Sequence, residues 1–146
     1  MSLENLLRIG KLKAHAPERV EVARLLAAAE RALRDAKNAA LSGDSRLDIA
    51  YRAIVQVALV AMLANNFRPS TSEPGHHQVL IQALPKTIGL PPERLQVLEA
   101  YRAARNQSDY RGIPVSDAVA EACAEDGQRL LADVRAWLQA HRTDLV

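Results

Sequence analysis

Residues at helical spacing between positions 95 and 109 form a stripe that begins apolar and becomes polar. The stripe consists of Leu95, Leu98, Arg102, Arg105 and Asp109, with Asn106 next to it. We expect the leucines to dock in a core and to carry the polar half into a partly enclosed groove. Two guanidiniums on one face can bind phosphate oxygens bidentately, and an asparagine amide can hydrogen-bond a base or a sugar. The stripe therefore predicts a binding site for a phosphate-bearing ligand.

The same residues also support a purely structural interpretation. Arg102 or Arg105 can form an ion pair with Asp48 or Asp109 across neighbouring helices, which requires no ligand. The sequence leaves both interpretations open.

A pair of histidines, His76 and His77, follows Gly75 close to the predicted start of a helix. The helix dipole at that position disfavours imidazolium, so we expect both rings to be neutral. Neutral imidazole can act as a base or as a metal ligand. However, adjacent helical side chains point about 100° apart, and no HExxH motif or other ligand spacing accompanies the pair. We therefore expect these rings to cap the helix or to hydrogen-bond a neighbour, and we expect no metal site.

The other reactive or polar residues have structural interpretations. Asp48 and Arg52 have the spacing of a simple helical ion pair. Tyr51 is expected to be a core ring with a hydrogen-bonded hydroxyl, and Cys123 a small core residue. Cys123 is the only cysteine, which excludes an internal disulfide and a multi-cysteine metal site. Trp137 is expected to pack within the last helix or at an interface.

Five helices are predicted from apolar periodicity and from proline, glycine and capping residues. Their approximate ranges are 17–41, 45–65, 75–88, 92–109 and 116–141, with 110–114 as a turn. Ser45 and Ser116 are the expected N-caps, and Pro85 should end or kink the third helix. Gly127 lies inside the last helix, which suggests close approach of another helix.

The second of these helices is apolar on nearly every face in its second half, as expected of a helix in the middle of a bundle. Its apolar run, residues 53–64, is too short to span a bilayer. No segment shows the alternation typical of a strand. We therefore predict one all-α domain over residues 1–146, an antiparallel bundle of about five helices with its core at about 17–141.

The composition agrees with one soluble domain. Of 146 residues, 49% are hydrophobic and 25% charged, while only 3% are aromatic, which suits helix packing better than strands. The net charge of +2 means that a nucleic-acid site must be a local patch. The first fifteen residues lack the uninterrupted apolar core of a signal peptide, so we expect a cytoplasmic location and no membrane association.

The chain resembles the HEPN superfamily over roughly residues 20 to 140. The resemblance rests on a long amphipathic helix, on Asp44-Ser-Arg-Leu-Asp-Ile-Ala-Tyr51 opening a buried helix, and on Arg-Asn-x-x-x-Tyr at residues 105–110 before a capped last helix. It implies a helical bundle that dimerises side by side and brings two copies of the motif together. Many members are ribonucleases of toxin–antitoxin or defence systems, and others are inactive partners of small nucleotidyltransferases.

The chain departs from the catalytic pattern of this superfamily. Active members carry a histidine four to six residues after the arginine, whereas this chain has Tyr110 there. The resemblance implies that Arg105 contacts phosphate and that Asn106 orients it. RNA cleavage also needs a group that takes the 2′-hydroxyl proton, and a phenol is a poor base at neutral pH. Either His76 or His77 supplies that group, or catalysis is lost.

The leading hypothesis is a non-catalytic or weakly catalytic HEPN-like homodimer, part of a toxin–antitoxin or defence system, that binds RNA, a nucleotide or a partner protein such as a nucleotidyltransferase. The expected binding residues are Arg102, Arg105, Asn106, Asp109, Tyr110 and Asp48. One alternative is a metal-independent ribonuclease, with catalytic candidates Arg105, Asn106, Tyr110, His76 and His77. Another is a purely structural bundle. No cofactor is expected. The homodimer is also expected because the apolar second helix and Trp137 suggest more apolar surface than one bundle can hide.

Overall fold

The fold is built on four long helices. The computed structural model describes residues 2–72 and 75–146. The long helices are α2 (Arg19–Asp35), α3 (Gly43–Ala64), α6 (Pro92–Arg111) and α7 (Asp117–His141). The short elements are α1 (Leu3–Arg8), β1 (Leu12–Ala14), β2 (Phe67–Pro69), α4 (His76–Gln82), α5 (Leu84–Thr87) and the 3₁₀ helix η1 (Thr143–Leu145). The predicted all-α class is confirmed.

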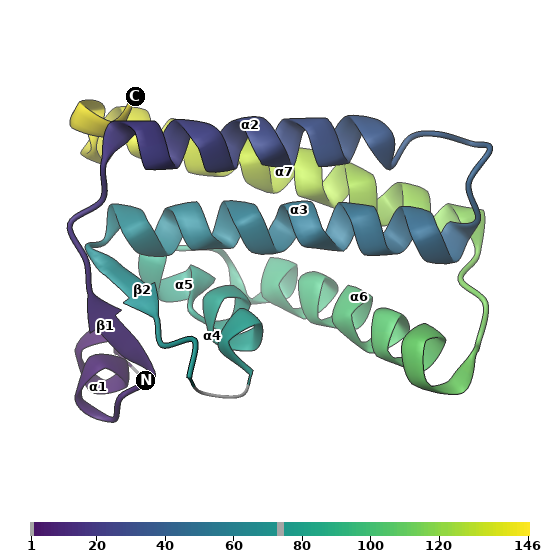
Figure 1. The fold of residues 1–146 in the computed structure, drawn as a ribbon, viewed down its shortest axis with the longest axis horizontal. Helices are drawn as coiled ribbons and strands as arrows, with labels where there is room; N and C mark the ends of the chain where they lie inside the picture. The colour runs from purple at the N-terminus through teal and green to yellow at the C-terminus, as the bar shows by residue number, and fades with distance from the viewer. Residues whose placement is uncertain (1, 73–74) are drawn as a thin grey trace.

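Helix α3 lies in the middle of the molecule. Figure 1 shows α2 and α7 above it, and α1, the two strands, α4, α5 and α6 below it. Consecutive long helices run antiparallel, as predicted, but α3 and α7 run parallel. Two contacts fix this direction: the Val115 amide before α7 donates to Asp44 at the start of α3 (2.6 Å), and Arg142 after α7 donates to the Ala64 carbonyl at the end of α3 (2.6 Å).

The central position of α3 explains its apolar sequence. Fifteen of its 22 residues are buried, which confirms the predicted buried helix. By length and composition alone α3 is long and apolar enough to cross a membrane, but 67% of its apolar window is buried inside the protein. Burial against α2 and α7 therefore accounts for much of the apolar surface that suggested a dimer, so that argument for dimerisation is weakened.

The predicted close approach at Gly127 is confirmed. A Cβ at this position would lie 2.7 Å from Cδ2 of Leu33 in α2. Leu33 is fully buried, so the absence of a side chain at Gly127 lets α2 and α7 pack closely.

The absence of strands was a wrong prediction. Strands β1 and β2 pair antiparallel, with Leu12 opposite Pro69 and Ala14 opposite Phe67. Each strand has three residues, which is too short to show an alternating pattern in the sequence. Helix α1, with Ser2 as its N-cap, was also not predicted. The described residues thus form seven α-helices rather than about five.

Several helix boundaries differ from the predicted ones. Helix α2 ends at Asp35 rather than near residue 41, and the Ala40 amide instead donates to the Asn38 side chain in the following turn. The N-cap of α3 is Ser42, whose hydroxyl accepts from the Ser45 amide, and not Ser45 itself. The predicted break at Pro85 is confirmed, because α4 ends at Gln82 and a separate short helix follows.

The last helix is mostly oriented as expected. Cys123, Leu130 and Val134 are buried as predicted, but Val119, also predicted to face inward, is 37% exposed. It lies in the first turn of α7, where the neighbouring Ala120 is the fully buried residue instead. Leu98 of α6 is buried, which confirms the predicted rotation of α6.

Candidate functional site

Arg105 lies where α6 meets α3. Its Nε donates to Asp48 Oδ1 at 3.0 Å and lies 3.7 Å from Asp109 Oδ2, one turn along α6. Its guanidinium carbon is 5.3 Å from the centre of the Tyr51 ring, within cation–π range. The structure thus contains the ion pair of the structural interpretation, and it also places the guanidinium at the surface.

Arg102 connects α6 to the start of α4. Its Nη2 donates to Gln78 Oε1 at 3.0 Å, and its Nη1 lies 3.7 Å from Glu99 Oε2. The other carboxylate oxygen of Glu99 is buried and makes no hydrogen bond with any residue of the described chain. Neither Asp48 nor Asp109 is the partner of Arg102, so only Arg105 forms the predicted Arg–Asp pair.

The contacts of Arg102 with Gln78 and Glu99 were not predicted from the sequence. Glu99 precedes Arg102 by three residues, a spacing that brings helical side chains together, and this signal was available. Gln78 comes from a different helix, and its proximity to Arg102 depends on how α4 packs against α6. Nothing in the local pattern of either helix indicates that contact.

His77 lies within the electrostatic influence of Arg105. Partial burial, then the neighbouring His76, then the positive charge of Arg105 hold the pKa of His77 below its usual value. The two imidazole rings are 4.3 Å apart in an edge-on arrangement. His77 therefore favours the neutral form, as predicted, although burial is the main cause rather than the helix dipole.

The Tyr51 ring lies under the guanidinium of Arg105. It is only 2% exposed, which confirms the predicted core ring. Burial, together with the negative charge of Glu99, raises the pKa of its phenol to about 12. The expected hydrogen bond of the Tyr51 hydroxyl is not found among residues 2–72 and 75–146. Tyr51 thus stays neutral and offers Arg105 the face of its ring.

A second row of α6 side chains becomes more exposed toward the end of the helix, from half-buried Arg102 and Asn106 to exposed Tyr110. Arg102, Asn106 and Tyr110 follow one another at steps of four residues, so they lie on adjoining parts of one helical face. Tyr110 was predicted to lie in a turn, but it belongs to the last turn of α6, which Gly112 ends with φ +66°. The Tyr110 ring is 84% exposed. The Asn106 amide makes no side-chain hydrogen bond within the described part of the chain.

The charges of this face nearly cancel. Arg102, Arg105 and Arg111 are opposed by Asp48, Glu99 and Asp109. Arg52 is exposed on α3, but the predicted Asp48–Arg52 ion pair is not formed because Asp48 turns to Arg105 instead. An anionic ligand would therefore have to compete with Asp48 for Arg105.

The described residues contain no cluster suited to a metal ion. No group of three or more histidine, cysteine, aspartate or glutamate side chains lies close enough together in them. Cys123 is buried, as predicted, and burial, with Asp126 nearby, raises the pKa of its thiol to about 12. The thiol is thus protonated and unreactive at neutral pH.

Comparison with protein-family models, with curated proteins and with solved structures finds no match to this chain.

Proposed function

We propose that this protein is a HEPN-like module that binds single-stranded RNA through the α6 face and cleaves it weakly or not at all. The observation that supports this best is the row Arg102, Asn106, Tyr110 on one helix, where Tyr110 is 84% exposed and the Asn106 amide has no side-chain hydrogen bond among residues 2–72 and 75–146. Arg105 lies beside this row, held over Tyr51 at 5.3 Å. The row is the α6 part of the Arg102–Tyr110 face on which the resemblance to the HEPN superfamily rests.

Each side chain of the row suits a different part of a nucleotide. A guanidinium binds phosphate, an amide can hydrogen-bond a base edge or a ribose hydroxyl, and an exposed ring can stack on an unpaired base. Base–aromatic stacking contributes about 1–3 kcal/mol per base. Single-stranded RNA offers all three groups at once, which favours it over a free nucleotide or a protein surface.

Weak or absent catalysis follows from the residue at position 110. Active HEPN ribonucleases have a histidine in that part of the motif, and the phenol of Tyr110 is a poor general base at neutral pH.

A second candidate function, a metal-independent ribonuclease, is favoured by His77. This histidine lies on α4 near Arg105 and favours the neutral form, which is the form that can accept the 2′-hydroxyl proton. In that reaction Arg105 would stabilise the charge that develops on the phosphate. We propose, for either function, a cytoplasmic homodimer within a toxin–antitoxin or defence system, with a nucleotidyltransferase-type protein as a second partner.

The test is a fluorescence anisotropy titration with a labelled single-stranded RNA at several salt concentrations. Arg102→Ala and Tyr110→Ala should each weaken binding about tenfold, since each removes a phosphate or a stacking contact. Arg34→Ala is the control, because Arg34 is exposed on α2, which lies on the opposite side of α3 from α6 (Figure 1). Dissociation constants weaker than about 100 µM at physiological salt, or equal losses in the control, would contradict the proposal.

An assay of the same RNA for cleavage separates the two candidates. We expect intact RNA after incubation with the protein. Cleavage that disappears in a folded His77→Ala variant would establish the ribonuclease instead.

A further inference from the structure

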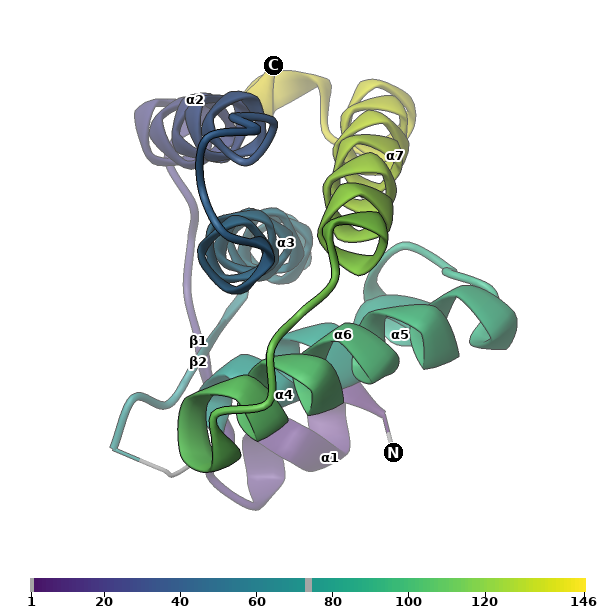
Figure 2. The same cartoon turned by 90° about the vertical axis from the view of Figure 1, so that its right-hand side faces the viewer.

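A groove runs along α2 and α3 on the side away from α7. It has a volume of about 640 Å³, and none of its lining residues comes from α7. Leu25 and Ala28 of α2, Leu59 and Leu63 of α3, and Pro69 of β2 provide its apolar lining. Figure 2 shows α7 on one side of α2 and α3, and the groove lies on the other side.

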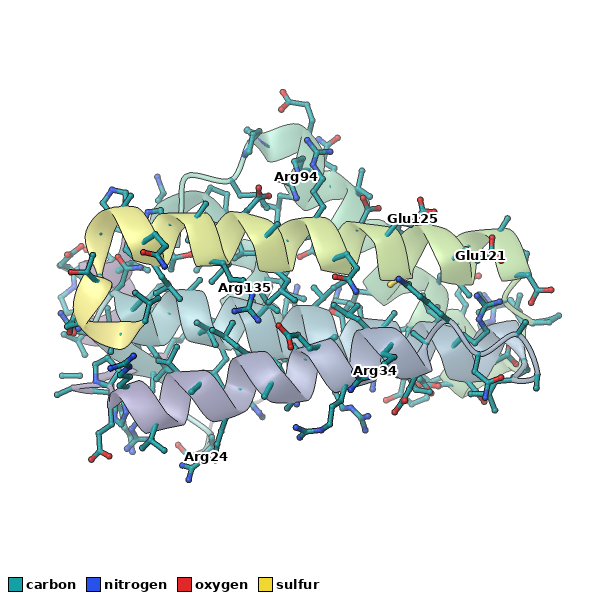
Figure 3. All side chains as sticks on the ribbon, turned by 90° about the horizontal axis from the view of Figure 1, so that it is seen from above. Arg24, Arg34, Arg94, Glu121, Glu125 and Arg135 are labelled. Atoms are coloured by element: carbon teal, nitrogen blue, oxygen red, sulfur yellow. The ribbon has the colours of Figure 1, made fainter. Side chains whose placement is uncertain are left out.

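Three arginines surround this apolar lining. Arg24 and Arg31 come from α2 and Arg68 from β2. In Figure 3 Arg24 extends from α2 away from α7. The ion pairs found within residues 2–72 and 75–146 involve none of these three guanidiniums. Glu21, the acidic residue of the groove, is occupied by His15, whose ring nitrogen lies 2.9 Å from its carboxylate.

The spacing of the arginines indicates the shape of the ligand. Arg24 and Arg31 are seven residues apart, which places them on one face of α2 about 10 Å apart along the axis. A small anion with one charge would reach only one of them. On an amphipathic helix lying along the groove, carboxylates at positions i and i+7 have the same separation, and leucines between them would face the groove.

The lining also argues against nucleic acid as the ligand. No aromatic side chain lines the groove, so it has no platform on which a base can stack. We propose that this groove binds an acidic amphipathic helix of a partner protein. The leucines of that helix would cover Leu25, Leu59 and Leu63, and its carboxylates would pair with Arg24, Arg31 and Arg68. This inference involves other helix faces than the proposed RNA site and does not depend on it.

The probe for this proposal is a fluorescein-labelled synthetic helical peptide of about five turns. Leucines occupy one face of the peptide and glutamates flank them at i and i+7. Two further peptides serve as comparisons: one with lysine in place of glutamate, and one with the same residues in scrambled order. Binding to the 146-residue chain is followed by fluorescence anisotropy.

One double variant reverses charge in the groove, and the other reverses charge on the α7 side of α2 and in the turn that follows α2. We expect the acidic peptide to bind the natural chain, and Arg24→Glu with Arg31→Glu to weaken that binding at least about tenfold. The control is Arg34→Glu with Lys37→Glu, two residues that line the surface shared with α7 instead. This control has the same net charge change and should stay within about twofold of the natural chain. Circular dichroism checks that both variants are folded.

Four results of the peptide-binding and sedimentation experiments would overturn the proposal. The first is that the acidic peptide does not bind, and the second is that the lysine or scrambled peptide binds equally well. The third is that both double variants lose equal affinity for the peptide. The fourth is a loss of self-association in sedimentation that is specific to the Arg24/Arg31 variant, because a second copy of the chain would then be the occupant of the groove. RNA binding is measured in parallel. A loss of RNA binding in the Arg24/Arg31 variant would assign the groove to nucleic acid, whereas unchanged RNA binding with lost peptide binding supports two separate sites.

Discussion

At the scale of single residues, Arg105 belongs to both a structural contact and a candidate binding site. Its ion pair with Asp48 spans two helices at 3.0 Å, but the Arg105 side chain is 38% exposed and that of Asp48 51% exposed. Ion pairs in such positions stabilise a fold by roughly 0.2–1 kcal/mol. The contact therefore orients the guanidinium over Tyr51 more than it holds α3 and α6 together, and a phosphate can reach the same guanidinium from solvent.

We predict that Arg105→Ala lowers the free energy of unfolding by less than about 1 kcal/mol, because Asp48 remains hydrated when its partner is removed. The same change should weaken RNA binding and reduce its dependence on salt. Urea denaturation measures the first effect and an anisotropy titration the second. A loss of 3 kcal/mol or more, typical of a broken buried pair, would show that Arg105 is chiefly structural.

We also predict that the pKa of His77, measured by NMR titration, lies below its ordinary value of 6.5 and rises in Arg105→Ala. The unfolded chain then binds more protons than the folded one between the folded pKa and 6.5. Stability is thus lost as the pH falls from 6.5 through the folded pKa, and His77→Gln should reduce that loss. A His77 pKa that is identical in the natural chain and in Arg105→Ala would place the imidazole outside the influence of Arg105.

These residues also show how far a site can be predicted from sequence. The Arg105–Asp48 contact was anticipated as one of the alternatives because both residues lie on polar faces of adjacent helices. The Arg102–Gln78 contact was not, since it depends on the angle at which α4 packs on α6. Likewise, the predicted helix ended near residue 109, whereas α6 continues for two more residues and includes Tyr110.

At the scale of elements, the junction between α3 and α7 determines the direction of two central helices. Asp44 in the first turn of α3 accepts from the Val115 amide at 2.6 Å, just before Ser116 caps α7. Gly43 lies directly against this loop: a Cβ at that position would lie 2.1 Å from the Val115 carbonyl oxygen. The parallel packing of α3 and α7 thus requires glycine at position 43.

We predict that Gly43→Ala destabilises the fold by about 1–3 kcal/mol, because the new methyl group meets backbone rather than a movable side chain. Gly127→Ala is the matched comparison. There the methyl group meets the end of Leu33, which can adjust, and alanine gains about 1 kcal/mol of helix propensity. Thermal unfolding of both variants tests whether Gly43→Ala is the more destabilising of the two changes. A Gly43→Ala variant as stable as the natural chain would mean that the α6–α7 loop moves freely away from α3.

The long helices were predictable because each carries a repeated signal. Their apolar seams span several turns, and capping residues or prolines mark most of the ends. The elements that were missed, α1 and the two strands, are three to six residues long. Such short segments form through contacts with the rest of the chain, and a local pattern cannot indicate those contacts.

At the scale of the whole molecule, the remaining question is where a second copy would bind. Helix α3 is mostly buried, and the large exposed apolar residues of the described chain lie on other parts of the molecule. Tyr110 and Ile113, 84% and 42% exposed, lie together at the end of α6, next to the Arg102–Asn106–Tyr110 row. A twofold contact at this end would bring two copies of the row together, as the resemblance to HEPN proteins implies.

We predict a homodimer in sedimentation velocity at micromolar concentration, with Ile113→Glu weakening the dimer at least about tenfold, since a carboxylate would then be buried without a partner. Val97→Glu is the control: Val97 is 43% exposed on the same helix but far from its C-terminal end. Equal effects of both changes would place the contact elsewhere.

A monomer at every concentration would contradict the dimer itself, and a single α6 row would then have to provide all of the RNA affinity. RNA binding by Ile113→Glu distinguishes these cases, because a site shared by two copies loses affinity with the dimer whereas a site within one copy does not.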